Sequence, residues 1–222
     1  MANGSFCTLC RQAGRQCRKL LGEREAPDGL LLDDPAFRVW GVALEHGAIP
    51  VLAYALEQRP KFNVRKERLM ARNLAPGPWL AELKHRIAAE ERDKLIQLPD
   101  GSSAAAGSLA DELLRITPAQ KLAYATDLSD NQTNRARLAL LARRAHTLFC
   151  EAAFNEADKE YAERSGHLTS RGCGEIAMAA KVERLVPFHL SRRYEANPLQ
   201  IYDEVRSVCQ RVVLPKASQL KP

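Results

Sequence analysis

Two runs of bulky and β-branched residues near the start of the chain predict β-strands. The first covers residues 30–32, and the second is a longer run over residues 37–57. Gly47 and Pro50 interrupt the longer run just after His46. Because glycine and proline favour turns, we expect a pair of strands joined by a turn close to His46.

From residue 118 onward, apolar runs alternate with amphipathic stretches. The pattern predicts a strand that leads to Asp127, a helix over 134–145, a strand over 147–153, a helix with Thr169 as N-cap, a strand that ends at His189, and a last helix with Asn197 as cap and Pro198 as first residue. Strands that alternate with helices are typical of the α/β class. We therefore predict an α/β half-domain over residues 30–222.

A segment over residues 59–117 interrupts this domain and differs from it in composition. It favours helices and contains a loose stretch at residues 100–107. Between Arg59 and Lys94 there are ten Lys or Arg and five Asp or Glu, so this stretch carries +5 of the total net charge of +6. We expect an inserted basic arm that binds a polyanion, since each neutralised phosphate releases counterions. A solvated helical surface is the alternative.

The first 29 residues contain little periodic apolar pattern and end in the turn sequence Ala-Pro-Asp-Gly29. We expect an irregular N-terminal segment. Cys7, Cys10 and Cys17 have the local spacing of a zinc knuckle, but a structural zinc needs four ligands and no further Cys or His follows before His46. Ordinary free cysteines are the alternative.

The sequence favours a cytoplasmic protein. No apolar stretch approaches the roughly 20 residues of a membrane span, and residues 1–30 lack the apolar centre of a secretory signal. The early basic residues lack the apolar face of a mitochondrial presequence. Six cysteines without a secretory signal suit a reducing compartment.

His46, Asp127 and His189 each follow a strand-like apolar run. Such placement puts polar side chains at the carboxyl edge of a sheet, where open α/β folds bind ligands. Imidazole and carboxylate are ligands for zinc, so the pattern predicts a metal site. Three unrelated edge residues are the alternative.

Six motifs from Trp40 to Tyr194 resemble the second half of the ribonuclease Z family, the tRNA 3′-processing endonucleases of the metallo-β-lactamase superfamily. They are Leu-Glu-His46, Pro-Gly-Pro-Trp-Leu-Ala-Glu-Leu-Lys84, Tyr-Ala-Thr-Asp127, Glu151-Ala-Ala-Phe154, Gly-His167-Leu-Thr169 and Phe-His189-Leu-Ser-Arg-Arg-Tyr194. The resemblance implies a metallo-β-lactamase-like αββα sandwich, of which this chain holds the C-terminal half. It also implies cleavage of tRNA precursors at two zinc ions.

The resemblance assigns roles to individual residues. His46 and His189 would each ligate one zinc, Asp127 would bridge both, and Glu151 would orient His167 as a general acid. The family's first half carries a His-x-His-x-Asp-His signature, and no two of the five histidines here lie close enough to form one. With about two ligands for each metal, we expect weak or no zinc binding by this chain alone.

Other residues are predicted to contact the RNA. Near His189 these are Ser191, Arg193 and Tyr194, whose guanidinium and hydroxyl donors suit a phosphate. On the arm they are Arg65, Lys66, Arg68, Arg72 and Lys84. The expected function is a ribonuclease Z-like phosphodiesterase completed by a homodimer partner or a separate N-terminal half. The alternatives are a noncatalytic RNA-binding protein and a small-ester metallo-hydrolase.

Overall fold

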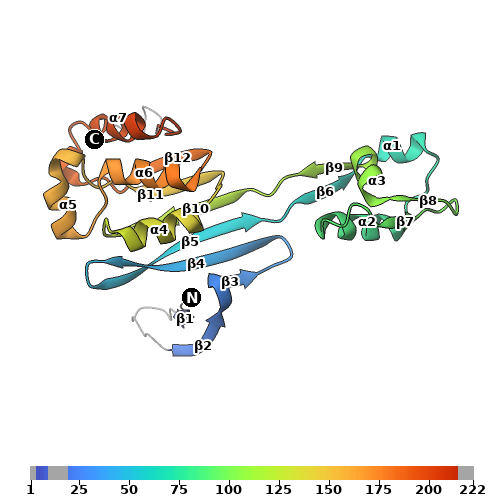
Figure 1. Ribbon diagram of the computed structural model, residues 1–222, viewed down its shortest axis with the longest axis horizontal. Coiled ribbons are helices and arrows are strands. Elements are labelled where there is room, and N and C mark those ends of the chain that lie inside the picture. Colours follow the sequence, from blue (N-terminus) through green and yellow to red (C-terminus); the bar gives the residue numbers. More distant parts are fainter. Residues whose placement is uncertain (1–3, 10–19, 215–222) are drawn as a thin grey trace, which may run out of the picture. The chain divides into compact units, whose positions relative to one another are not determined.

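The computed structural model describes the backbone of residues 4–9 and 20–214 and the side chains of residues 25–214. The chain divides into two compact units (Figure 1). Unit 1 contains residues 1–58 and 120–222, and unit 2 contains residues 59–119. In the sequence, unit 2 lies between two strands that are hydrogen-bonded neighbours in the sheet of unit 1.

Unit 1 is built on a six-stranded mixed sheet. Its strands in chain order are β3 (Leu30–Asp33), β4 (Phe37–His46), β5 (Ile49–Gln58), β10 (Lys121–Ala125), β11 (Thr147–Glu151) and β12 (Arg184–Phe188). Their spatial order is β12-β11-β10-β5-β4-β3. The pairs among β10, β11 and β12 are parallel, whereas the other neighbouring pairs are antiparallel. The α/β class predicted from the sequence is confirmed.

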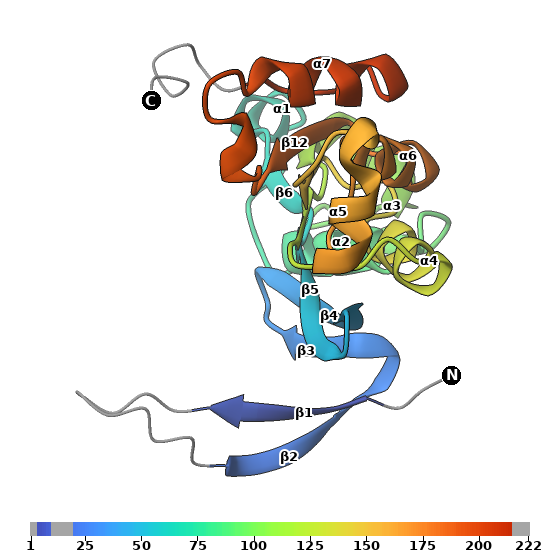
Figure 2. The same cartoon turned by 90° about the vertical axis from the view of Figure 1, so that its left-hand side faces the viewer.

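Helices α4 (Gln132–Leu141) and α6 (Ser170–Ala180) pack on one face of this sheet (Figures 1 and 2). The shorter α5 (Lys159–Ser165) precedes α6, and α7 (Leu199–Val208) packs on α6. Single 3₁₀ turns are formed by η1 (Pro27–Gly29), η2 (Glu156–Asp158) and η3 (Arg192–Tyr194). In the described part of the chain, no helix is long and apolar enough to cross a membrane.

The helix boundaries agree with the sequence in part. Thr169 caps α6 as expected, since its hydroxyl accepts a hydrogen bond from the Gly172 N–H. Helix α4 ends four residues earlier than expected, and the backbone turns left-handed at Arg144, whose N–H bonds the Ala180 carbonyl. Helix α7 begins after Pro198 without the Asn197 cap that the sequence predicted.

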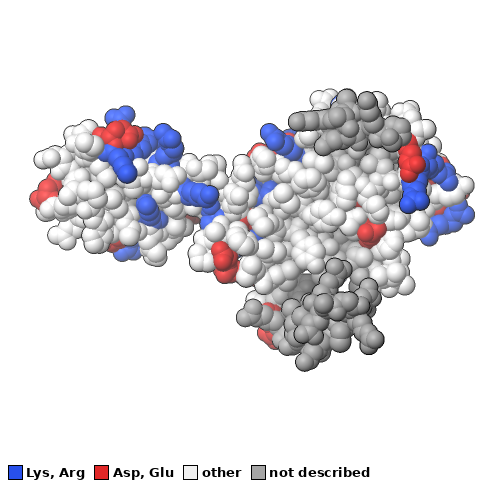
Figure 3. Space-filling model, turned by 180° about the vertical axis from the view of Figure 1, so that it is seen from behind, with Lys and Arg blue, Asp and Glu red and all other residues white. Residues whose placement is uncertain are grey.

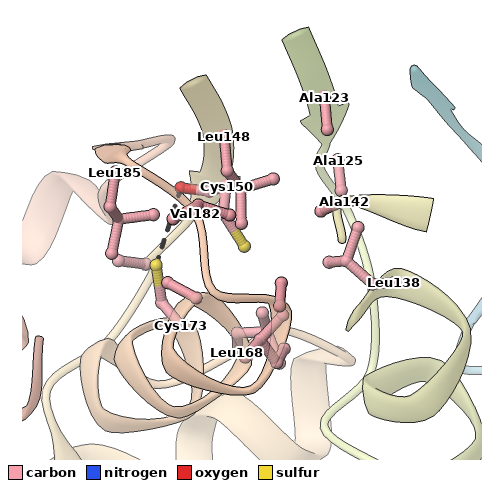
Figure 4. Packing of buried hydrophobic residues seen from close by; sticks show 14 of the residues in the cluster. Ala123, Ala125, Leu138, Ala142, Leu148, Cys150, Leu168, Cys173, Val182 and Leu185 are labelled. Carbon is pink, nitrogen blue, oxygen red and sulfur yellow. Dashed lines mark hydrogen bonds between the residues drawn. The ribbon is translucent and has the colours of Figure 1, made fainter. Parts of the chain in front are cut away.

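Small residues allow α4 and α6 to approach the sheet closely. Ala53, Ala55, Ala123 and Ala125 on the central strands are all buried beneath the helices. Larger side chains fill the space around them, including Leu138, Leu148, Leu185 and the thiol of Cys173 (Figure 4). Cys150, Cys173 and Cys209 are free and buried in this core.

Unit 2 has a hydrophobic core of its own. Its elements are β6 (Lys61–Val64), α1 (Lys66–Ala71), α2 (Trp79–Ala88), β7 (Leu95–Gln97), β8 (Ser103–Ala105), α3 (Ala106–Leu113) and β9 (Leu114–Thr117). Strand β6 pairs with β9, and β7 pairs with β8, both antiparallel. Trp79, Leu83 and Leu113 are among its buried residues. Residues 103–107, expected to be loose, form β8 and the start of α3 because their small side chains pack into this core.

The N-terminal segment also differs from the expectation of irregular structure. Strands β1 (Gly4–Leu9) and β2 (Leu20–Ala26) pair antiparallel. Backbone hydrogen bonds hold such a ribbon and need no apolar periodicity, which is why the hydrophobic pattern gave no sign of it. Of the proposed zinc knuckle, Cys10 and Cys17 lie outside the described residues, as does the Cys7 side chain.

Candidate metal centre

Four ionisable side chains converge at the carboxyl edge of the sheet. Asp127 follows β10, Glu151 ends β11, His189 follows β12, and His167 lies in the loop before α6. One ligand atom from each lies within 4.8 Å of the others. The parallel strands β10, β11 and β12 end together, so residues far apart in sequence meet at this edge.

Asp127 and His189 lie next to each other, with 3.6 Å between Oδ1 and Nδ1. Both residues have left-handed backbones, with φ of 56° and 57°. Asp and His tolerate this conformation better than most residues, although it costs some energy. The turns therefore direct both side chains to the sheet edge.

His46 reaches the same edge from the antiparallel strand β4. Its ring centroid lies 4.8 Å from that of His167, and its Nδ1 lies 2.7 Å from the Gly166 carbonyl oxygen. Gly166 ends α5 in a left-handed conformation, and a Cβ there would lie 3.0 Å from Nδ1 of His46. If Nδ1 donates to this carbonyl, Nε2 keeps the lone pair that a metal requires. His46 lies beside the group of four converging side chains and is not part of it.

Glu151 is fully buried, and both of its oxygens accept hydrogen bonds from the protein. The backbone N–H of Asp127 donates to Oε2 at 2.7 Å, and that of Leu168 donates to Oε1 at 2.8 Å. The Nδ1 atoms of His167 and His189 lie 3.1 and 3.2 Å from Oε2. A carboxylate with this many donors suits the orientation of the two histidines better than metal ligation.

The same contacts shift two pKa values. Burial acts to raise the pKa of Glu151, but the hydrogen bonds from His167 and the Leu168 N–H outweigh it and lower this pKa. The hydrogen bond to Glu151 raises the pKa of His167 against the opposing effect of partial burial. The pair therefore favours the ionised carboxylate beside a histidine that holds its proton.

Asn134 on α4 is a site residue that the sequence analysis missed. Its buried amide accepts a hydrogen bond from the Glu45 N–H at 3.0 Å and donates to the carbonyls of Glu45 and Ser129, both at 2.8 Å. These bonds join the end of β4, next to His46, to the loop that follows Asp127. The available signal was the spacing of Asn134 four residues before Leu138, which places both side chains on the same face of a helix.

Two of the residues near His189 that are predicted to contact phosphate also bind groups of the protein. Tyr194 is buried, and its hydroxyl donates to Asp158 Oδ2 at 2.5 Å. Burial and then this hydrogen bond raise the pKa of Tyr194 to about 12. The Arg193 guanidinium pairs with Asp158 at 3.0 Å and lies over the Tyr161 ring. Both side chains thus contact residues of η2 and α5. Their contact with phosphate stays a prediction.

Ser191 also has a local role, because its hydroxyl accepts from the Arg193 N–H as the cap of η3. Ser191 is only partly buried, and its proposed phosphate contact likewise stays a prediction.

The predicted RNA contacts of unit 2 differ in exposure and pairing. Lys66, Arg68 and Arg72 are exposed, whereas Arg65 and Lys84 are half-buried. Arg72 forms an ion pair with Glu112 at 3.2 Å. Unit 2 as a whole holds eleven basic and eight acidic residues, so its net charge is +3. On the face in Figure 3, its basic side chains are spread among a few acidic ones.

Comparisons with known proteins show which relatives this chain resembles and how much of their length it covers. No family model matches it. Ribonuclease Z of Deinococcus radiodurans is 39% identical over 166 residues, which are 75% of this chain and 48% of that protein. Ribonuclease Z of Synechococcus sp. is 32% identical over 84% of this chain and 56% of that protein, and ribonuclease Z of Geobacillus kaustophilus is 30% identical over 90% and 61%. The chain thus spans about half the length of these relatives.

Two solved structures also match over 84% of this chain. Human tRNase Z, short form, is 18% identical with a TM-score of 0.44, and 43% of that protein is covered. The metallo-β-lactamase fold protein YhfI from Bacillus subtilis is 16% identical with a TM-score of 0.48, and 49% of it is covered. By class, the chain is an α/β protein with candidate metal ligands at the carboxyl edge of its sheet. Its sequence belongs with the ribonuclease Z family over the part that it covers.

Proposed function

We propose that this chain provides one half of a metal-dependent phosphodiesterase that cleaves tRNA precursors at the 3′ side. The observation that carries the proposal is the convergence of Asp127, Glu151, His167 and His189 at one sheet edge. Relatives that match most of this chain are ribonucleases Z. The arrangement suits phosphodiester hydrolysis, which needs cations, an oriented proton donor and an exposed reaction surface.

The donor set fits a metal that prefers nitrogen and oxygen ligands, such as zinc. His46, Asp127 and His189 would be the ligands, with Asp127 bridging two ions because its two oxygens can reach separate metals. Glu151 fits this role poorly, since the protein already satisfies its oxygens. Bound zinc would lower the pKa of a water and screen the phosphate charge. Catalytic zinc normally has three or more protein ligands, so further ligands are required from another polypeptide segment.

His167 is the proposed proton donor to the leaving oxygen. Its Nδ1 lies against Glu151, so Nε2 is the nitrogen left for the substrate. The hydrogen bond to Glu151 raises the pKa of His167, which favours the protonated imidazole that a general acid requires. The His167 side chain is 18% exposed, so its ring can be reached from solvent at the sheet edge.

The test adds a polypeptide segment that is expected to supply the further metal ligands. The part of Deinococcus radiodurans ribonuclease Z that lies outside the match is fused ahead of residue 30, and a tRNA precursor with a 3′ extension is the substrate. We expect zinc-dependent cleavage at the 3′ side, and we expect Asp127→Ala to abolish it together with metal binding. His167→Ala should leave zinc bound and slow cleavage by about 10²- to 10⁴-fold.

His85→Ala is the matched control, because it removes an exposed imidazole from unit 2 and should leave the rate unchanged. Equal cleavage by the His167→Ala fusion would refute the general-acid role. A fusion that binds zinc, leaves precursor tRNA intact and hydrolyses a small ester would point to the small-ester hydrolase. Tight RNA binding without zinc and without cleavage would point to the noncatalytic RNA-binding protein.

A further inference from the structure

A groove in unit 1 lies at the opposite end of the parallel strands from the candidate metal centre. It has a volume of about 1120 Å³, and the residues that line it include Leu140, Arg143, Arg144, Met178, Lys181 and Arg211. Arg144 lies three residues before β11, and Lys181 lies three residues before β12. The groove is therefore at the amino ends of these strands, whereas the candidate centre is at their carboxyl ends. The name basic groove is used here for this site.

The positive charge of the basic groove is not balanced within it. Its lining contains four cations and one acid, Glu183, so the net charge of the lining residues is +3. The four cations are exposed, and within the described part of the chain they form no ion pair. The Arg211 guanidinium donates to the Val182 carbonyl at 2.6 Å, which leaves its other N–H groups for a ligand. The groove thus suits an anionic partner.

Two large apolar side chains lie among these cations. Leu140 on α4 is 70% exposed, and Met178 on α6 is 49% exposed. Arg143 follows Leu140 by three residues, and Lys181 follows Met178 by three residues, so each apolar side chain has a cation as its neighbour one helical turn away. Helices α4 and α6 pack against each other, which brings the two pairs to one site (Figure 1). The groove therefore offers apolar contacts flanked by positive charge.

Two of the cations stand where glycine would be the less costly residue. Arg144 and Lys181 both have left-handed backbones, each with φ of 55°. Lys181 ends α6, a position at which glycine is common because it adopts this conformation without strain. Cations near a helix C-terminus also stabilise the helix dipole, but a basic residue within the last turn would do so without a left-handed backbone. The long side chains at these two positions thus fit a binding role better than a local one.

We propose that the basic groove binds an acidic amphipathic segment of another protein. Its apolar side chains would contact Leu140 and Met178, and its carboxylates would lie beside the four cations. Amphipathic helices commonly bind grooves through such anchors. The groove exceeds the roughly 300–1,000 Å³ of a small-molecule pocket, so a polymer segment fits it better than a metabolite. This inference does not depend on the proposed function.

RNA is the other polyanion to consider for this groove. Unpaired bases stack on aromatic side chains, and no aromatic residue is among the described residues that line the groove. The phosphates of an RNA duplex would pair with the cations but would gain nothing from Leu140 and Met178. A partner that carries both carboxylates and apolar side chains accounts for both features of the groove, so the observations favour the acidic peptide.

The test measures binding of a fluorescein-labelled synthetic peptide to the full 222-residue chain by fluorescence anisotropy. The probe is a helical peptide of Leu, Ala and Glu, with the leucines on one face and the glutamates on both sides of that face. In the matched peptide, glutamine replaces every glutamate. We expect the glutamate peptide to bind, and its affinity should fall as salt screens the charges. The glutamine peptide should bind clearly more weakly.

Replacement of both Arg144 and Lys181 by glycine separates a binding role from a structural one. The double variant loses two cations, so the affinity for the glutamate peptide should fall by about 5- to 10-fold. The midpoint of urea unfolding should stay the same or rise, because glycine adopts the left-handed backbone without strain. Lys159→Ala combined with Arg192→Ala is the matched control, since it removes two exposed cations that lie outside the groove. The control should bind the peptide like the unaltered chain.

Leu140→Gln tests the apolar contact. The affinity for the glutamate peptide should fall by roughly 10-fold, because a large apolar side chain would no longer be buried on binding. Circular dichroism should be unchanged, since Leu140 is exposed in the free chain.

Several results would overturn the proposal. They are no binding of the glutamate peptide, equal affinity for the two peptides, and unchanged affinity in both the glycine variant and Leu140→Gln. An RNA duplex that displaces the peptide, and whose affinity falls in the glycine variant but not in Leu140→Gln, would assign the groove to RNA instead. A dimer of this chain that Leu140→Gln dissociates in analytical ultracentrifugation would assign it to a second copy.

Discussion

At the residue scale, the candidate site depends on two buried polar side chains, Glu151 and Asn134, that form hydrogen bonds within the protein. Glu151 accepts hydrogen bonds from three backbone N–H groups and contacts two imidazoles, and Asn134 joins the strand end at Glu45 to the loop at Ser129. A buried polar group is costly unless it is paired, so each of these residues fixes its neighbours in one arrangement. The proposed ligands His46 and Asp127 lie on the two segments that Asn134 connects.

Replacement of Asn134 by alanine should destabilise the chain by roughly 2–4 kcal/mol, because it leaves the Glu45 N–H and the Ser129 carbonyl without their buried partner. Urea unfolding followed by circular dichroism measures the change. Gln132→Ala is the control, since Gln132 is exposed in the first turn of the same helix and should change the unfolding free energy by less than about 0.5 kcal/mol. Equal effects of the two substitutions would show that the Asn134 bonds contribute little.

At the element scale, unit 2 is a folded insertion and its basic residues fall into two groups. Arg72, Arg86 and Arg92 form ion pairs with acidic neighbours. Lys66 and Arg68 on α1 are exposed and form no ion pair among the described residues. Cations without an acidic partner contact phosphates at lower cost, so α1 is the element that we expect to bind RNA first.

The double substitution of Lys66 and Arg68 by alanine should weaken tRNA binding. It should also lower the slope of log affinity against log salt by about one for each phosphate that is no longer neutralised. Filter binding at several salt concentrations measures the slope. Arg92→Ala is the comparison, because Arg92 already pairs with Asp111 at 2.7 Å and should change the slope less. If both proteins keep the slope of the unaltered chain, unit 2 presents only a solvated surface.

The sequence predicted the elements that carry strong local signals. The strands of unit 1, the Thr169 cap and the α/β alternation follow from apolar periodicity and capping chemistry, and the structure confirms them. The β1 and β2 ribbon was not predicted, because backbone pairing leaves no periodic trace. The inward direction of Tyr194 was missed for another reason: its partner Asp158 lies 36 residues away, and sequence spacing carries no information on such a contact.

At the scale of the whole molecule, the candidate centre is shared between distant parts of the chain and, by our proposals, a second polypeptide segment. Strand order brings His46, Asp127 and His189 to one edge although they span 144 residues of sequence. Sequence motifs identified these residues, but only the parallel pairing of β10, β11 and β12 places two of them within contact distance.

This shared centre predicts that the purified chain alone holds clearly fewer than two equivalents of zinc. His46 and Asp127 would supply two ligands to one ion, and Asp127 and His189 would supply two to the other, whereas stable zinc sites use three or four. Elemental analysis after dialysis measures the bound zinc, with Asp127→Ala as the reference for nonspecific uptake. Two zinc ions held through dialysis by the chain, and absent from Asp127→Ala, would mean that the chain completes its own site. In that case, no second polypeptide segment would be needed as a source of metal ligands.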